Sequence, residues 1–207
     1  MASSSSLRTS WPYDVYLRFK GNDIPRNFTS DLYEGLRKRE ISTFLDDDDD
    51  GAYTADDLKL RNNRSYFERI PQAMEEFQVA LVVFSKNYAT SRRCLNQLVK
   101  IMECNQKNRL TVIPIFYGVD QADVQKQMGR FAEAFARHGM RCKSDEEMNE
   151  VRRWRTTLPQ VANLSGCVIH DRTKSKCIQD LIDQISSKLW EASLTYFQNV
   201  VGIETHL

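Results

Sequence analysis

The chain has 207 residues, and its 41% hydrophobic content can fill one core at the roughly 100 to 200 residues typical of a domain. Its 29 basic and 28 acidic residues leave a net charge of +1, so no global field favours nucleic acid or an anionic membrane surface. The longest apolar run, Val79–Phe84, is far shorter than the roughly 18 residues of a membrane span. We therefore expect neither a nucleic-acid nor a membrane partner.

The first residues and the cysteines indicate the compartment. Residues 1–11 form a serine-rich tail without the apolar stretch of a secretion signal, so we expect a disordered tail and a cytoplasmic protein, with the nucleus as a second compartment. The odd number of cysteines and the absence of a CxxC pair predict reduced thiols and no metal site. These cysteines are Cys94, Cys104, Cys142, Cys167 and Cys177.

The first elements alternate between strand and helix. Val15–Phe19 is a short apolar segment that predicts a strand. Apolar residues spaced four apart then predict one face of a helix, at Phe28, Leu32 and Leu36. Residues 41–45 predict a second strand, which the aspartates of 46–50 should end. We expect that carboxylate run to be a hydrated loop and not a calcium site, because it lacks spaced ligands.

The middle of the chain contains the expected centre of the sheet. Residues 65–77 suit a helix in which Pro71 must lie in the first turn or bend the axis. Val79–Phe84 is apolar at every position, as in a strand that helices cover on both faces. Thr90 or Ser91 can cap the next helix. The apolar stripe of that helix is Leu95, Leu98, Val99 and Met102.

The remaining elements complete the alternation. Residues 110–117 predict a buried strand interrupted by Pro114, followed by helical patterns over 121–138 and 146–163. Val168 and Ile169 suit a last short strand. The closing helix has amphipathic spacing at Ile178, Leu181, Ile182, Ile185 and Leu189.

This alternation predicts an α/β protein with a flavodoxin-like three-layer fold, in which helices flank a parallel sheet of roughly five strands. Ligands of such folds bind at the carboxyl ends of the strands. Here that rim should collect residues 20–23, the acidic loop from 46, and residues 85–91 and 117–120.

Several chemistries lack their motif. The loop after the first strand, FKGNDIPRN, has one glycine, so neither a dinucleotide fingerprint nor a P-loop is present. The central strand ends at Ser85, where a phospho-receiver would need an aspartate. A serine hydrolase would need a GxSxG turn, which the sequence lacks.

The ordered motifs of the chain resemble those of plant Toll/interleukin-1 receptor (TIR) domains. They read YDVYLRFKGND, FTSDLYEGL, VALVVFSKNYATSRRCLNQL, VIPIFYGVDQADVQKQMGRFAEAF and RWRTTLPQVANLSG. The resemblance covers residues 12–190, and residues 191–207 resemble the linker that precedes the nucleotide-binding module of leucine-rich-repeat immune receptors. It implies a domain of defence and cell-death signalling that assembles with other TIR domains and cleaves the nicotinamide glycosidic bond of NAD. No cofactor is implied, because NAD is the candidate substrate.

The motif that carries catalysis in this family departs from its usual form. TIR domains typically read SxWCLxEL at the head of the helix after the central strand, with the glutamate catalytic. Here SRRCLNQL places Arg93 at the tryptophan position and Gln97 at the glutamate position. Gln97 is two residues, roughly 200°, round the helix from Leu95, so it can face the cleft near Arg93 and Lys100. Without the resemblance, such a glutamine would pass for a solvated surface residue.

The loss of this carboxylate has a chemical consequence. Departure of nicotinamide leaves an oxocarbenium-like ribose. A carboxylate both binds the ribose hydroxyls and stabilises the positive charge, whereas an amide can only bind the hydroxyls. Losing one such partner typically costs about 10² to 10³ in rate. The resemblance places further substrate contacts at Phe19, Lys20, Gly21, Asp23, Ser91, Arg93 and Cys94. Lys20 replaces an arginine and loses its bidentate grip.

Other family positions have changed as well. The Ser-His pair through which many TIR domains associate reads Ser30 and Asp31 here, and Gly129 is a further expected interface position. Asn63 stands where the family has a glycine, in a loop that the aspartate run lengthens.

Two hypotheses follow from these residues. The first is an association module with little or no NAD cleavage, motivated by Arg93 and Gln97. The second is an active NAD glycohydrolase that works at a reduced rate through substrate orientation and a neighbouring carboxylate. Glu75 and Glu76 are candidates for that carboxylate, although charged pairs on helices are usually solvated.

Overall fold

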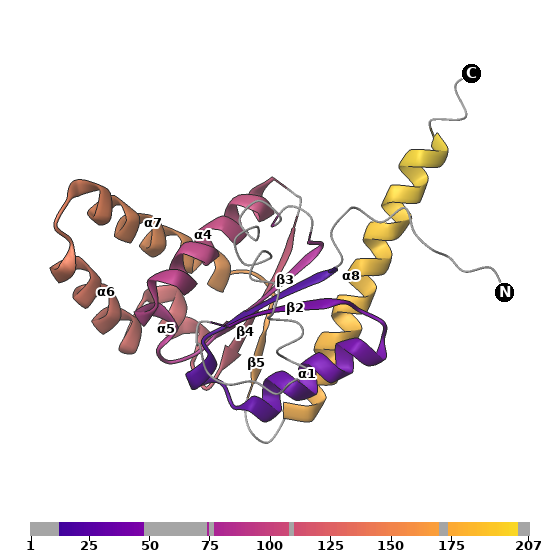
Figure 1. Cartoon of the computed structure of the whole chain (residues 1–207), viewed down its shortest axis with the longest axis horizontal. Coiled ribbons are helices and arrows are strands. Elements are labelled where there is room, and N and C mark those ends of the chain that lie inside the picture. Colours follow the sequence, from indigo (N-terminus) through magenta and orange to yellow (C-terminus); the bar gives the residue numbers. More distant parts are fainter. Residues whose placement is uncertain (1–12, 48–73, 75–76, 108–109, 170–173, 203–207) are drawn as a thin grey trace.

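The computed structural model of the chain describes residues 13–47, 74, 77–107, 110–169 and 174–202. Its centre is a five-stranded parallel sheet in the order β2-β1-β3-β4-β5 (Figure 1). The strands are β1 (Val15–Phe19), β2 (Thr43–Asp47), β3 (Val79–Phe84), β4 (Thr111–Tyr117) and β5 (Cys167–Ile169). The predicted flavodoxin-like α/β fold is confirmed.

Helices cover both faces of the sheet. They are α1 (Arg26–Lys38), α4 (Arg92–Gln106), α5 (Gln121–Lys126), α6 (Arg130–Arg141), α7 (Asp145–Ala162) and α8 (Lys174–Gly202), with short 3₁₀ turns η1 (Gly21–Asp23) and η3 (Tyr88–Thr90). α1 and α8 lie on one face, and α4 to α7 lie on the other (Figure 1). Each face therefore has its own hydrophobic core.

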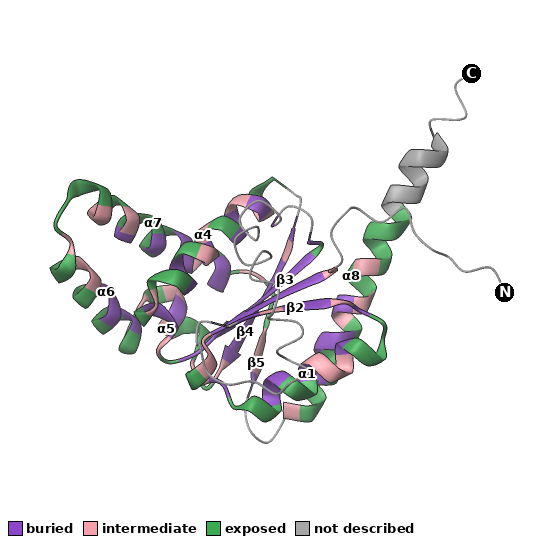
Figure 2. Ribbon diagram, viewed as in Figure 1, coloured by how far each residue is buried: buried purple, intermediate pink, exposed green. Residues whose placement is uncertain are grey.

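Alternation along the strands assigns each side chain to one of these cores. In β3, Val79, Leu81 and Val83 belong to the core under α1 and α8, whereas Ala80, Val82 and Phe84 belong to the core under α4. All six are buried, as the purple colour of the strands shows (Figure 2). The unbroken apolar run is thus explained by a central strand with helices on both sides.

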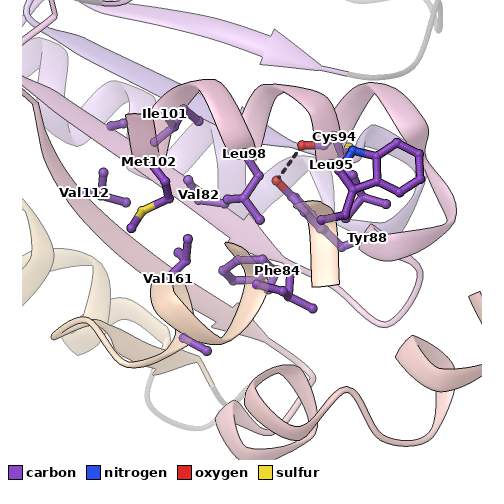
Figure 3. Close-up of a cluster of buried hydrophobic side chains, with 14 of the residues drawn as sticks. Val82, Phe84, Tyr88, Cys94, Leu95, Leu98, Ile101, Met102, Val112 and Val161 are labelled. Carbon is purple, nitrogen blue, oxygen red and sulfur yellow. Dashed lines mark hydrogen bonds between the residues drawn. The ribbon is translucent and has the colours of Figure 1, made fainter. Parts of the chain in front are cut away.

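The N-cap residue and the buried apolar stripe of α4 determine where this helix begins and how it is rotated against the sheet. Ser91, and not Thr90, is the N-cap residue, because its Oγ accepts a hydrogen bond from the Cys94 amide at 3.1 Å. Leu98 and Met102 lie over Val82 and Val112 of the sheet (Figure 3). Burial of this stripe sets the rotation of α4 and hence which residues face outward.

Two boundaries differ from the predictions. β2 is Thr43–Asp47, not 41–45, so the strand extends into the aspartate run. The pattern over 121–138 is two helices, because Gln127 and Gly129 adopt φ angles of +54° and +53° and break the axis between α5 and α6.

Gly166, directly before β5, allows the backbone of β5 to pack closely against β4. A Cβ on Gly166 would lie 2.1 Å from the carbonyl oxygen of Pro114, so the backbones touch at this point. We expect Gly166→Ala to lower the free energy of unfolding by about 2 to 3 kcal/mol, as overpacking does. Gly139→Ala in α6 is the matched control, because no described atom beyond its chain neighbours and its own helix backbone lies within 4 Å of its added Cβ. Urea denaturation of both variants checks this, and equal stability of the two would contradict it.

Cys167 yields a prediction about pH. Burial, with a smaller contribution from Cys177, raises the pKa of this thiol from 9.0 to about 11. Iodoacetamide at about pH 8 should therefore alkylate Cys167 about 100 times more slowly in the folded chain than in denaturant, as peptide mass spectrometry would measure. Because the unfolded chain releases this proton first, stability falls as the pH rises from about 9 to about 11. Similar alkylation rates in both states would contradict the shift.

Some predictions fall outside the described residues: the tail 1–11, most of the helix at 65–77, and the aspartate run from residue 48 onward. The domain boundary at residue 190 stays a prediction, and α8 continues past it to Gly202. None of the five cysteines forms a disulfide. Within the described ranges, no helix combines the length and apolarity that crossing a bilayer requires.

Candidate functional site

The loops after β1 and β3 are joined at the carboxyl end of the sheet. The carboxylate of Asp23 accepts hydrogen bonds from Ser85 Oγ at 2.6 Å, from the Asn87 amide at 3.1 Å and from Asn87 Nδ2 at 3.0 Å. The predicted rim is therefore built as a connected unit here. Because three donors already use the Asp23 oxygens, this residue holds the two loops together.

A charged pair lies buried beside this rim. Arg18 on β1 is opposite Asp46 on β2, two residues along from the pairing of Tyr16 with Phe44. Strand alternation points all four side chains toward α4. Arg18 Nη1 lies 2.8 Å from Asp46 Oδ1, and both side chains are 0% exposed. The expectation that Asp46 ends its strand and stays hydrated is wrong, because a buried guanidinium replaces the water.

The same carboxylate binds Tyr16. The phenol of Tyr16 donates to Asp46 Oδ2, and burial, followed by the charge of Asp46, raises the pKa of Tyr16 well above its usual value. Burial alone would lower the pKa of Arg18, but the charge of Asp46, together with smaller contributions from Cys94 and Tyr16, outweighs burial and raises this pKa. Arg18 Nη2 also donates to Cys94 Sγ at 3.3 Å. β1, β2 and the first turn of α4 are therefore locked together.

Arg93 completes this group from the solvent side. Its Nη2 lies 2.8 Å from Asp46 Oδ1, and its side chain is 45% exposed. We call Tyr16, Arg18, Asp46 and Arg93 the Asp46 cluster. It contains two guanidinium groups and one carboxylate, so its formal charge is +1. Arg93 is the member of the cluster at its outer, solvent-exposed edge.

A hollow of about 550 Å³ lies between α4 and α7. Its described lining consists of Arg93, Asn96, Gln97, Val99, Lys100, Glu150, Arg153 and Trp154. Gln97 is half-buried, and its Oε1 is a buried atom without a hydrogen-bond partner among the residues that the structure describes. The inference that Gln97 lies off the apolar stripe, beside Arg93 and Lys100, is confirmed.

The described acidic side chains in and around this hollow form ion pairs with arginine or lysine. Glu150 is the one carboxylate in the described lining, and it pairs with Arg92, whose guanidinium also stacks 5.6 Å from the Trp154 ring centroid. Arg153 and Lys100 lie 2.7 Å and 3.6 Å from oxygens of Glu103. The described part of the hollow is therefore rich in cations and offers no unpaired carboxylate.

The other predicted substrate residues lie elsewhere. Phe19 is 2% exposed in the core under α1 and α8, so only its backbone can reach a ligand. Lys20 and Gly21 are half-buried where η1 begins, and neither they nor Asp23 belong to the described lining of the hollow. Ser91 and Cys94 serve the cap and the contact with Arg18. The structure thus brings together Arg93 and Gln97, and the substrate roles of all these residues stay predictions.

The predicted interface residues form two separate surfaces. Ser30 and Asp31 are exposed on α1, where Asp31 pairs with Lys174 of α8 at 3.0 Å. Gly129 is the exposed N-cap of α6, on the opposite face of the sheet. The three residues therefore lie on two different faces of the domain, and their interface roles stay predictions.

Some candidate groups are not placed or not found. Asn63, Glu75 and Glu76 lie outside the described residues, so the idea of a substitute carboxylate at Glu75 or Glu76 stays a prediction. Within the described ranges, no group of three or more His, Cys, Asp or Glu side chains is arranged to hold a metal ion. Sequence reasoning missed the pairing of Arg18 with Asp46. Both are charged residues on the inward face of adjacent strands, but the register that pairs them is not visible in the local sequence.

Comparisons with known proteins identify the family. The family model described as TIR domain matches residues 12–203. TMV resistance protein N of Nicotiana glutinosa is 49% identical over 100% of this chain, and disease resistance protein RUN1 of Vitis rotundifolia is 41% identical over 98% of it. The chain spans 17% and 14% of the lengths of these relatives. The TIR domains of the activated Roq1 resistosome, which directly recognizes the pathogen effector XopQ, superpose with a TM-score of 0.69 at 38% identity, covering 84% of this chain and 99% of theirs. The chain therefore belongs to the TIR domain family.

Proposed function

We propose that this TIR domain is an association module of plant immune signalling and that its own cleavage of NAD is weak or lost. Its relatives include disease-resistance proteins, and the TIR domains that it superposes on belong to an activated resistosome. Its partners are other TIR domains, as a homo- or hetero-oligomer. It acts in the cytoplasm or nucleus, without binding nucleic acid or membrane.

The observation that carries this proposal is Gln97 in the hollow. In NAD hydrolysis the bond between ribose C1′ and the nicotinamide nitrogen breaks, and its electron pair leaves with nicotinamide. Water then adds to C1′ and loses a proton, which gives ADP-ribose. Positive charge develops on the ribose meanwhile, and a carboxylate at position 97 would stabilise it. The neutral Oε1 of Gln97, buried without a described partner, can accept a bond from a ribose hydroxyl but supplies no full negative charge.

The surroundings of Gln97 support loss over replacement. A substitute carboxylate would have to be free to approach the ribose. Glu150 is paired with Arg92, and Asp46 is fully buried and bound by Arg18 and Arg93. Releasing either acid would break an ion pair, and for Asp46 that pair is buried, where breaking it is costly.

Two measurements on the purified chain test this function. Light scattering at increasing concentration should reveal self-association, or association with an active TIR domain whose turnover then changes in proportion to the complex formed. Nicotinamide release from NAD should stay within about threefold of a Gln97→Ala control, since neither side chain is charged. Cleavage at least tenfold above that control would support the alternative, an active NAD glycohydrolase. Absence of any association would reject the module.

A further inference from the structure

We propose that the hollow between α4 and α7 is a binding site for a phosphorylated sugar, whose phosphate is held by Lys100 and Arg153. The two helices lie on the same face of the sheet (Figure 1), and both contribute to the lining. The volume of about 550 Å³ is typical of small-molecule sites. Apart from Val99 and Trp154, every described lining residue has a charged or amide side chain, so the hollow suits a polar ligand.

The phosphate end consists of two cations that share one carboxylate. Lys100 Nζ lies 3.6 Å from Glu103 Oε2, and Arg153 Nη2 lies 2.7 Å from Glu103 Oε1. In the part of the chain that the structure describes, Glu103 is the one carboxylate within ion-pair distance of either cation, so the group has a formal charge of +1. Lys100 and Arg153 also line the hollow and are 54% and 64% exposed. A second oxyanion can therefore reach both cations from the hollow.

Phosphate fits this arrangement well. Arginine offers phosphate oxygens two parallel N–H donors, and lysine adds a point charge. Asn96 supplies a neutral donor, because its Oδ1 accepts from Trp154 Nε1 at 2.7 Å, which leaves Nδ2 to donate elsewhere. Asn96 is one helical turn before Lys100 and lines the hollow too. The three donors thus converge on one part of the hollow.

The buried oxygen of Gln97 indicates the sugar. Its Oε1 is buried without a hydrogen-bond partner among the described residues, and a buried acceptor of this kind needs a donor. A sugar hydroxyl is such a donor, whereas an ionised phosphate mainly accepts. Gln97 is three residues before Lys100 on α4, which puts their Cβ atoms about 5 to 6 Å apart. One sugar can therefore contact Gln97 through a hydroxyl and Lys100 through its phosphate.

The acid in the described lining does not oppose the phosphate. Glu150 pairs with Arg92 in the first turn of α4, about two turns before Lys100. Its charge is thus offset at the far end of the hollow. Binding of a sugar phosphate requires no carboxylate at position 97, so this inference is independent of whether NAD is cleaved.

Calorimetric titration of the whole chain with ribose 5-phosphate tests the site. Arg153→Gln and Lys100→Gln should each weaken binding about tenfold, because each removes a charge-assisted hydrogen bond. Glu103→Gln should instead strengthen binding about threefold, since this carboxylate competes with phosphate for the same two cations. Higher NaCl should weaken binding to the unchanged chain. A purely structural role of these ion pairs would not produce a gain on loss of Glu103.

Arg137→Gln is the matched control for the charge. Arg137 is an exposed arginine of α6 that pairs with Glu133 and does not belong to the described lining of the hollow, so its loss should leave binding unchanged. Gln97→Leu tests the sugar contact, because it should weaken binding of ribose 5-phosphate and leave binding of inorganic phosphate unaltered. Free ribose should bind at least about tenfold more weakly than its 5-phosphate.

Several results would overturn the proposal. These are no binding of ribose 5-phosphate, equal binding to Arg153→Gln and Arg137→Gln, weaker binding to Glu103→Gln, or equal affinity for ribose 5-phosphate and inorganic phosphate. Circular dichroism verifies that each variant is folded. The proposed function is tested separately, by nicotinamide release and by association, and neither measurement depends on this titration.

Discussion

Gln97→Glu is expected to raise the rate of NAD cleavage about ten- to hundredfold over the unchanged chain. One preorganised charge at a developing cation is worth about 10² to 10³ in rate, and pairing of Arg93 with the new glutamate removes part of that. The substitution is nearly isosteric and places the carboxylate where Oε1 of Gln97 is buried in the hollow wall. Nicotinamide release at saturating NAD measures the effect.

Asn96→Asp is the matched control for this experiment. Asn96 is the adjacent residue on α4, lines the same hollow, and accepts a hydrogen bond from Trp154 Nε1 at 2.7 Å that an aspartate would retain. It adds the same charge at a different angle around the helix, so it should not raise the rate. An equal gain from Asn96→Asp would show that any negative charge suffices. No gain from Gln97→Glu would show that more than this carboxylate has been lost from the site.

Asp46→Asn is expected to lower the free energy of unfolding by about 3 to 5 kcal/mol, because it removes the carboxylate paired with a fully buried arginine. Arg18→Met should cost less, about 1 to 2 kcal/mol, since Asp46 keeps Arg93 and Tyr16 and methionine fills much of the vacated space. Urea denaturation compares the two variants. The asymmetry arises because Arg18 is fully enclosed, whereas Asp46 has a second cation at the surface.

The double variant Arg18→Met/Asp46→Asn provides the control, because it removes both buried charges together. It should be more stable than Asp46→Asn alone, as replacing a whole buried pair is often neutral. If Arg18→Met instead proves as costly as Asp46→Asn, the buried cation is not the source of the loss. If the double variant is the least stable of the three, the pair contributes more than its desolvation costs.

The fold was largely predictable because its signals are local. The all-apolar β3 and the stripe on α4 follow from covered strands and amphipathic helices, which leave a periodic pattern in the sequence. The break at Gln127 was missed, because a non-glycine residue at a φ of +54° has no compositional signature. Gly166 was not singled out either, since its role depends on contact with the distant Pro114.

The candidate site was less predictable, because its contacts join residues that are distant in the sequence. The spacing on α4 correctly placed Gln97 near Arg93, and the structure shows that both line the hollow. It could not reveal that Arg93 binds Asp46, because that contact joins positions 47 residues apart. Aspartates are usually exposed, so composition alone misassigned Asp46 to a hydrated loop. Strand register decides the outcome, and register emerges only when the sheet is assembled.

The two helical layers have a consequence for how such a domain can diversify. Ser30 and Asp31 lie on the α1 layer, whereas Gln97 and Arg93 lie behind the sheet on the α4 layer. Close-packed strands separate the two, and they yield little to a change on either side. Under the proposed function, substitutions on α1 that alter association can therefore accumulate without disturbing position 97 behind the sheet. In this arrangement, a TIR domain could lose NAD cleavage and keep its association surface. It could equally change its partner while the residues around position 97 stay unchanged.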